Sequence, residues 1–151
     1  MLVSLHVRNF VLLEDCRIEF HPGLNVLTGE TGAGKSILVG ALNLLIGERG
    51  STESVRDSTQ DAVVEAAFDL ASSSPQAQLV RPLLEESGIL WEEGDLILSR
   101  ILSPNGRNRI FINNTQCLLK ILKDVGTLLI DLHGQHDHQS LLHKSSYRPL
   151  L

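Results

Sequence analysis

The stretch "LNVLTGETGAGKSILVGALNLLIG", residues 24–47, decides the fold, because it joins a short apolar run to a glycine-rich turn and then to an apolar helix. Leu24–Thr28 is short and apolar, as expected of a central strand. Ser36–Ile46 is apolar on almost every side, which is typical of a helix that is covered on most of its surface. Gly47 can end that helix as its C-cap. We therefore expect a strand, a glycine-rich loop and a helix, in that order.

The glycine-rich loop matches the pattern G-x-x-x-x-G-K-[ST] of a P-loop. Its residues are Gly29, Glu30, Thr31, Gly32, Ala33, Gly34, Lys35 and Ser36. Glycines let successive N–H groups fold into a nest around phosphate oxygens, and the N-terminus of the helix adds a partial positive charge. We expect Lys35 to reach the β- and γ-phosphates and Ser36 to offer its hydroxyl to Mg²⁺. The motif therefore predicts ATP and Mg²⁺ as cofactors.

Length, charge and cysteine content limit the possible classes of protein. The 151 residues, 42% of them hydrophobic, are enough for one domain with a core. A net charge of −5 gives no general attraction for nucleic acid, so contact with DNA would need a local basic patch. Cys16 and Cys117 lack a metal-binding spacing and suggest reduced thiols in the cytoplasm. We find no signal peptide and no apolar run of about 18 residues, so we expect no membrane partner.

The rest of the chain alternates between strand and helix patterns. Apolar residues at every second position predict strands at 3–7, 16–20 and 64–70, and a hairpin of 96–102 with 107–113 around the Ser103–Gly106 turn. Helices are predicted at 76–88 and 116–125, a turn at 113–115, and a further buried strand at 128–132. We predict an α/β fold with a mixed sheet and a β-rich arm.

Three segments together resemble one known family. They are "LHVRNFVLLEDCRIEFHPGLNVLTGETGAGKSILVGAL" at 5–42, "NGRNRIFINN" at 105–114 and "LLIDLHGQHDHQSLL" at 128–142. The sequence resembles the N-terminus of the SMC-like ABC ATPases over almost the whole chain. The resemblance implies that residues 1–151 form the N-terminal lobe of an ABC-type ATPase head. It also implies a nucleoid-associated protein that acts in DNA double-strand break repair and recombination.

The same resemblance implies one further site residue and several partners. By its position in "HGQH", Gln135 is the expected Q-loop glutamine, with Gln139 as the second choice, and its family role is to contact Mg²⁺ and the attacking water. The expected partners are the C-terminal lobe of the same head, a second head that completes the ATP site in a homodimer, and DNA. The signature motif and Walker B are expected beyond the chain, so this segment alone should be a very weak ATPase.

A different interpretation treats Leu128–Asp131 as a Walker B strand, with Asp131 holding Mg²⁺ through water. The chain would then be a stand-alone P-loop NTPase or a helicase fragment. Two features argue against this: an ABC Walker B continues with a glutamate where this chain has Leu132, and the segment leads directly into "HGQHDHQ", which suits a Q-loop. A third possibility is a nucleotide-dependent interaction module that does not hydrolyse ATP.

The cluster of histidines after residue 132 raises the hypothesis of a zinc site. Its potential ligands are His133, His136, Asp137, His138 and His143. The adjacent positions 136–138 suit a tetrahedral site poorly, so a polar loop that faces the phosphates is favoured.

Arg100, Arg107 and Arg109 lie on the predicted hairpin and would either contact DNA phosphates or line a solvated strand face. The resemblance implies that Arg56 contacts nucleotide or DNA, while Val11 stands where some relatives carry an arginine. The roles of these four arginines stay open.

Overall fold

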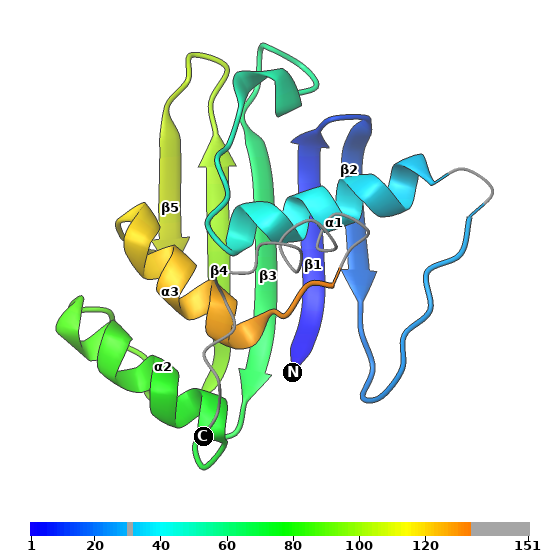
Figure 1. The fold of residues 1–151 in the computed structure, drawn as a ribbon. Helices are drawn as coiled ribbons and strands as arrows, with labels where there is room; N and C mark the ends of the chain where they lie inside the picture. The colour runs from blue at the N-terminus through cyan, green and yellow to red at the C-terminus, as the bar shows by residue number, and fades with distance from the viewer. Residues whose placement is uncertain (30–31, 134–151) are drawn as a thin grey trace, which may run out of the picture.

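The computed structural model describes residues 1–29 and 32–133, which form two layers (Figure 1). One layer is a sheet with the strand order β2-β1-β3-β4-β5-β6, and every neighbouring pair is antiparallel. The strands are β1 Leu2–Phe10, β2 Leu13–Glu19, β3 Ala62–Leu70, β4 Gly94–Leu102, β5 Asn108–Ile112 and β6 Thr115–Gln116. The other layer contains α1 Ala33–Leu45, α2 Pro75–Glu86 and α3 Leu119–Leu129, and a 3₁₀ turn spans Thr52–Ser54.

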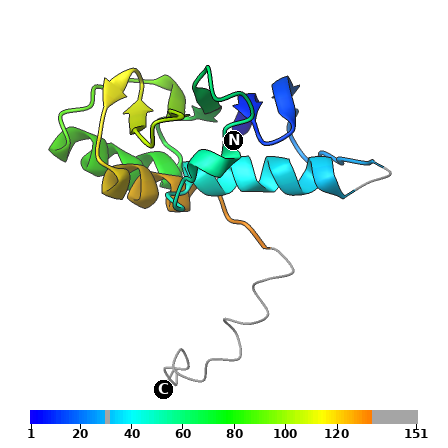
Figure 2. The same cartoon turned by 90° about the horizontal axis from the view of Figure 1, so that it is seen from above.

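All three helices cover the same face of the sheet, as the view from above shows (Figure 2). In β3 every second side chain, such as Val64, Ala66 and Phe68, is buried against the helices. The helix α1 packs through Ile37, Ala41, Leu44 and Leu45, the spacing of one helical stripe. The core therefore lies between the sheet and this helical layer. Burial of each large apolar side chain in this core contributes about 1.5–3 kcal/mol to stability.

The other face of the sheet carries polar side chains. His6, Arg8, Glu65 and Ser99 point to this side and remain partly or fully exposed. The expected alternation of buried and exposed positions is therefore confirmed in β1, β3 and the β4–β5 hairpin, while in the edge strand β2 the inward positions Cys16 and Ile18 are only partly buried. The expected helix at 76–88 is confirmed as α2, and Asn113 and Asn114 adopt the positive φ angles of a tight turn. No helix within residues 1–29 and 32–133 is long and apolar enough to cross a membrane.

Two predicted strands are absent, and with them the mixed character of the sheet. Leu24–Thr28 is extended but pairs with no described strand, and its side chains are exposed, Leu24 at 91% and Val26 at 71%. A central strand needs a neighbour on each side, and every strand of this sheet is already paired in an antiparallel order that ends at β2 and β6. The described sheet is therefore antiparallel throughout.

The strand predicted at 128–132 was also wrong. Residues 119–129 form α3, and the chain leaves the helix at Ile130. Leu122, Val125 and Leu129 continue the helical spacing toward the core, so the apolar run that suggested a strand is the end of an amphipathic helix. Gly126 lets α3 cross α1 closely, because a Cβ at this position would lie 2.5 Å from the Leu45 carbonyl oxygen.

Candidate phosphate-binding site

The glycine-rich loop leads into α1 as the motif predicts. Gly32 is the N-cap residue and α1 begins at Ala33, beyond the edge strand β2 (Figure 1). Gly29, Gly32, Gly34, Lys35 and Ser36 are all exposed. Glu30 and Thr31, the middle of the predicted loop, lie outside the described residues. The described part of the motif therefore stands at the accessible end of a helix that is packed on the sheet.

The first turn of α1 offers free backbone donors. The Ser36 N–H donates to the Gly32 carbonyl at 3.0 Å, which closes the first turn. The N–H groups before it have no acceptor within the helix, and no side chain caps Gly32. The first turn also has no acidic side chain that would compete with an anion. This helix end therefore presents N–H groups with no acceptor among residues 1–29 and 32–133, together with a partial positive charge, and this combination binds phosphate.

The two glycines at 32 and 34 leave open space beside these donors. A Cβ built at either position would meet no atom of the described residues within 4 Å. Gly32 has an ordinary helical φ of −61°, and neither residue is among the positive-φ glycines of the chain. Neither packing nor backbone conformation in the protein therefore requires glycine at these two positions, and the space they leave is available to a ligand.

Lys35 and Ser36 supply the side-chain chemistry of the site. Lys35 is exposed and forms no ion pair with a carboxylate of the described ranges. The Ser36 hydroxyl donates to the Gly32 carbonyl at 2.9 Å, which leaves its oxygen lone pairs free. An oxygen donor of this kind beside phosphate-binding amides suits Mg²⁺, which prefers oxygen ligands. Among the described residues, Ser36 is therefore suited to be one protein ligand of a magnesium ion.

The remaining predicted site residues are only partly described. Gln135 and Gln139 lie outside the described residues, as do His136, Asp137, His138 and His143. Asp131 is described: it follows α3 rather than a strand, its side chain is 83% exposed, and it lies 3.1 Å from the His133 ring. A Walker B aspartate needs the end of a buried strand, so the structure does not favour that role for Asp131. Within residues 1–29 and 32–133 no group of three potential metal ligands comes together.

The structure corrects the expectation for Arg100. A solvated strand face or a contact with DNA was expected for this residue, but its side chain is 1% exposed and points into the core. It is in phase with Leu96, Leu98 and Leu102 on β4, all of which face the helices. This phase is the sequence signal that would have identified Arg100 as buried.

The other three arginines remain at the surface. Arg107 is exposed in the turn before β5, and Arg109 forms a 2.6 Å ion pair with Asp61 on the open side of the sheet. Arg56 is exposed, and its N–H donates to the Asn9 carbonyl at 3.1 Å. Asn9 also holds the loop that follows, because its side-chain amide contacts the carbonyls of Asp57 and Gln60 at 3.0 Å. Sequence reasoning missed this role of Asn9.

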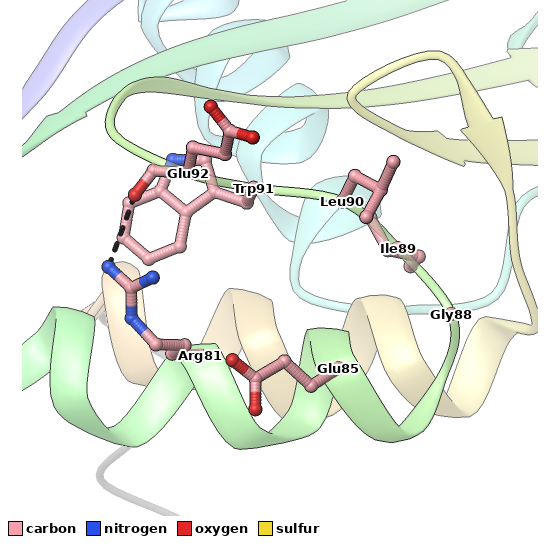
Figure 3. A pocket seen from close by; sticks show the side chains of 7 residues that line it. All are labelled: Arg81, Glu85, Gly88, Ile89, Leu90, Trp91 and Glu92. Atoms are coloured by element: carbon pink, nitrogen blue, oxygen red, sulfur yellow. Dashed lines mark hydrogen bonds between the residues drawn. The ribbon is translucent and has the colours of Figure 1, made fainter.

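A hollow of about 470 Å³ lies away from the P-loop, between α2 and residues 88–92 of the connection from α2 to β4 (Figure 3). Its wall includes Trp91, which is 8% exposed, with the Arg81 guanidinium 5.0 Å from the centre of its ring. Arg81 also donates to the Glu92 carbonyl at 3.2 Å. These contacts pack the α2–β4 connection and bring no phosphate-binding groups together, so the P-loop remains the candidate site.

Comparison with known proteins places this geometry in a family. The family model described as "AAA domain" matches residues 4–125. Among curated proteins, the DNA repair protein RecN of Halalkalibacterium halodurans is 42% identical over 151 residues, all of this chain and 26% of that protein. RecN of Bacillus subtilis is 39% identical over the same coverage, and RecN of Vibrio cholerae is 40% identical over 142 residues. The chain thus spans about a quarter of the length of these relatives.

Two solved structures share this fold. The Smc head domain of Pyrococcus furiosus, bound to the C-terminal domain of ScpA, aligns with a TM-score of 0.71 at 18% identity, covering 95% of this chain and 38% of that one. The recombination mediator protein RecF with ATP aligns with a TM-score of 0.56 at 20% identity, covering 78% and 27%. At these identities the likeness shows the fold, which is that of a P-loop ATPase.

Proposed function

Because this chain belongs to the AAA-domain family, we propose that it binds ATP and Mg²⁺ at its P-loop as one lobe of an SMC-like ATPase head that acts in DNA repair. The observation that carries the proposal is the first turn of α1: among the described residues, its N–H groups before Ser36 have no acceptor, Gly32 and Gly34 are unobstructed, and Lys35 forms no ion pair. The similarity to RecN over the whole chain supports DNA double-strand break repair and recombination as the process, and the cytoplasm and the nucleoid as the location.

Each group of the site has a proposed part in binding. The amides of Gly32, Gly34 and Lys35 hold the phosphate oxygens, and the Lys35 ammonium neutralises the β- and γ-phosphates. The Ser36 oxygen is a ligand for Mg²⁺, which when bound neutralises phosphate charge. Gln135 completes the site as the Q-loop glutamine, with a role toward Mg²⁺ and the attacking water. The segment alone hydrolyses ATP very weakly, because these residues position phosphates without supplying a general base.

The proposed partners follow from what the lobe leaves uncovered and from its relatives. Leu24 and Val26 form an exposed apolar segment directly before the P-loop, which suits a strand completed by a C-terminal lobe of the same head. A second head in a homodimer completes the ATP site, and DNA is the substrate of the whole protein. The stand-alone NTPase with Asp131 as Walker B is not favoured, since Asp131 follows a helix.

The test of ATP binding is the substitution Lys35→Ala, measured by titration calorimetry with ATP and Mg²⁺. Loss of a charge-assisted contact costs about 1.5–3 kcal/mol, so we expect affinity to fall at least tenfold. Lys120→Ala is the matched control, because it removes the same charge from an exposed lysine whose described ion pair is with Asp124 on α3. Equal affinity of Lys35→Ala and the wild type would refute the proposed site.

A further inference from the structure

Arg100 is a buried cation near the end of β4, on the side of the sheet that faces the helices. It is the largest of the fully buried side chains, and on β4 it stands in the same inward row as Leu98 and Leu102. A buried charge is costly unless other groups compensate it. Within the described residues no carboxylate forms an ion pair with Arg100. Its charge must therefore be balanced by groups of another kind.

The groups that balance it are carbonyls at the end of α1. The Arg100 Nη1 donates to the Leu44 carbonyl at 2.7 Å and also to the Glu48 carbonyl. The Leu44 carbonyl lies in the last turn of α1, where the aligned peptide dipoles place a partial negative charge, and Glu48 follows directly after the helix C-cap and Gly47. The helix has no basic residue of its own in its last turn. Arg100 thus supplies, from a strand, the positive charge that this helix end lacks.

The same guanidinium is fixed to the sheet on its other side. Arg100 Nε donates to the Asn108 side-chain oxygen at 3.1 Å, and Asn108 begins the neighbouring strand β5. One planar group therefore joins β4, β5 and the C-terminus of α1. The α3 helix presses on the same helix end, because Gly126 allows contact with Leu45 and Ile46. The C-terminal end of α1 is held firmly, while the residues of its first turn, 34–36, are exposed.

We infer that Arg100 is a positioning residue for the phosphate site: by fixing the C-terminus of α1 to the sheet, it sets where the N-terminal amides of that helix stand. The inference rests on the proposed binding of ATP at the P-loop. With 13 residues α1 is about 20 Å long, so a tilt of about 5° at the fixed end displaces the first turn by about 1.7 Å. Displacements of about 1 Å are enough to reduce the effect of positioned groups about a hundredfold.

The test separates positioning from general stability. Arg100→Met keeps an apolar chain of similar reach but removes the three hydrogen bonds, and Arg100→Lys restores a charge without the fork that joins Asn108 to the helix. Leu96→Ala is the control, because it weakens the same inward row of β4 without touching the end of α1 through a hydrogen bond. ATP affinity is measured by calorimetry well below the melting temperature of each variant, together with hydrogen exchange of the amides at 34–36.

We expect Arg100→Met to bind ATP at least tenfold more weakly and to exchange these amides faster, Arg100→Lys to lie between it and the wild type, and Leu96→Ala to bind normally. Affinity of Arg100→Met within twofold of the wild type, or an equal loss of affinity in Leu96→Ala, would overturn the inference.

If Arg100→Met does not fold, Asn108→Ala replaces it, because this substitution removes only the hydrogen bond that joins the guanidinium to the sheet. We then expect ATP affinity to fall at least threefold, and normal binding would contradict the inference. Failure of the wild type to bind ATP would refute the proposed function instead.

Discussion

At the scale of single residues, the glycines of the P-loop differ from the glycines elsewhere in the chain. Gly47 has a φ of +94°, and a Cβ there would lie 2.5 Å from the Lys123 side chain, so the protein itself requires glycine at this position. A Cβ at Gly32 or Gly34 would meet no atom within 4 Å in the part of the chain that the structure describes, and neither residue has a positive φ. Glycine in a helix is less favourable than alanine by about 1 kcal/mol. Gly34 therefore costs stability that no contact among the described residues recovers.

We predict that Gly34→Ala separates stability from binding. The free energy of unfolding should rise by about 0.5–1 kcal/mol, because alanine loses less backbone entropy and has room for its methyl group. ATP affinity should fall at least tenfold, because the same methyl group occupies the space of the phosphate oxygens. Urea unfolding and titration calorimetry measure the two effects. A variant that binds ATP as well as the wild type would show that the space beside Gly34 is not used by the ligand.

At the scale of the elements, the crossing of α1 and α3 determines how closely the helical layer packs. The contact of Gly126 with Leu45 and Ile46 leaves no room for a side chain, whereas Gly40 in α1 meets no atom within 4 Å. Both residues lie inside helices, so their intrinsic helix propensities are equal. Their difference is only in what surrounds them, which makes them a matched pair.

We predict opposite effects for alanine at these two positions. Gly126→Ala should destabilise the protein by about 1–3 kcal/mol, because the new methyl group forces the two helix backbones apart. Gly40→Ala should stabilise it by about 0.8–1 kcal/mol through helix propensity alone. Chemical unfolding of the two variants gives both numbers. A shift of the same sign in both would mean that α3 does not press on α1 as described.

The elements also show which parts of the fold a sequence can predict. The half-buried strands were predictable because one face of each meets the helices and the other meets solvent, which imposes a period of two. The P-loop and α1 were predictable because the motif fixes both. The runs at 24–28 and 128–132 were not, since a few apolar residues fit a strand, a helix end or an uncovered segment equally well. The burial of Arg100 was not predicted, because an arginine is usually exposed. Its position in the same alternating row of β4 as Leu98 and Leu102 nevertheless indicates that it faces the helices.

At the scale of the whole molecule, apolar side chains remain uncovered next to the P-loop. Leu24 is 91% exposed, Val26 71% and Leu27 47%, and all three lie in one extended segment. A contiguous apolar segment of this kind favours contact with another surface. In solution the chain has only further copies of itself available, so we expect self-association that rises with concentration.

We predict that Val26→Glu lowers this self-association, because a charge in the segment must lose its hydration when two copies meet. Stability should change by less than about 0.5 kcal/mol, as for other exposed positions. Leu90→Glu is the matched control: Leu90 is 87% exposed, but on the α2–β4 connection, so association should be unchanged. Light scattering over a range of concentrations measures the effect. A wild-type chain that stays monomeric throughout would contradict the prediction.

The pairing of β1 with β3 has a consequence for the order of events during synthesis. Arg8 pairs with Val63, so two adjacent strands are separated by 55 positions of chain. The P-loop, α1 and the Arg56 loop all belong to the segment that this pairing closes. Closing such a long segment carries an entropic cost and slows folding compared with a hairpin. On a ribosome the P-loop emerges well before β3, and its helix acquires the sheet that supports it only after that later strand has been made.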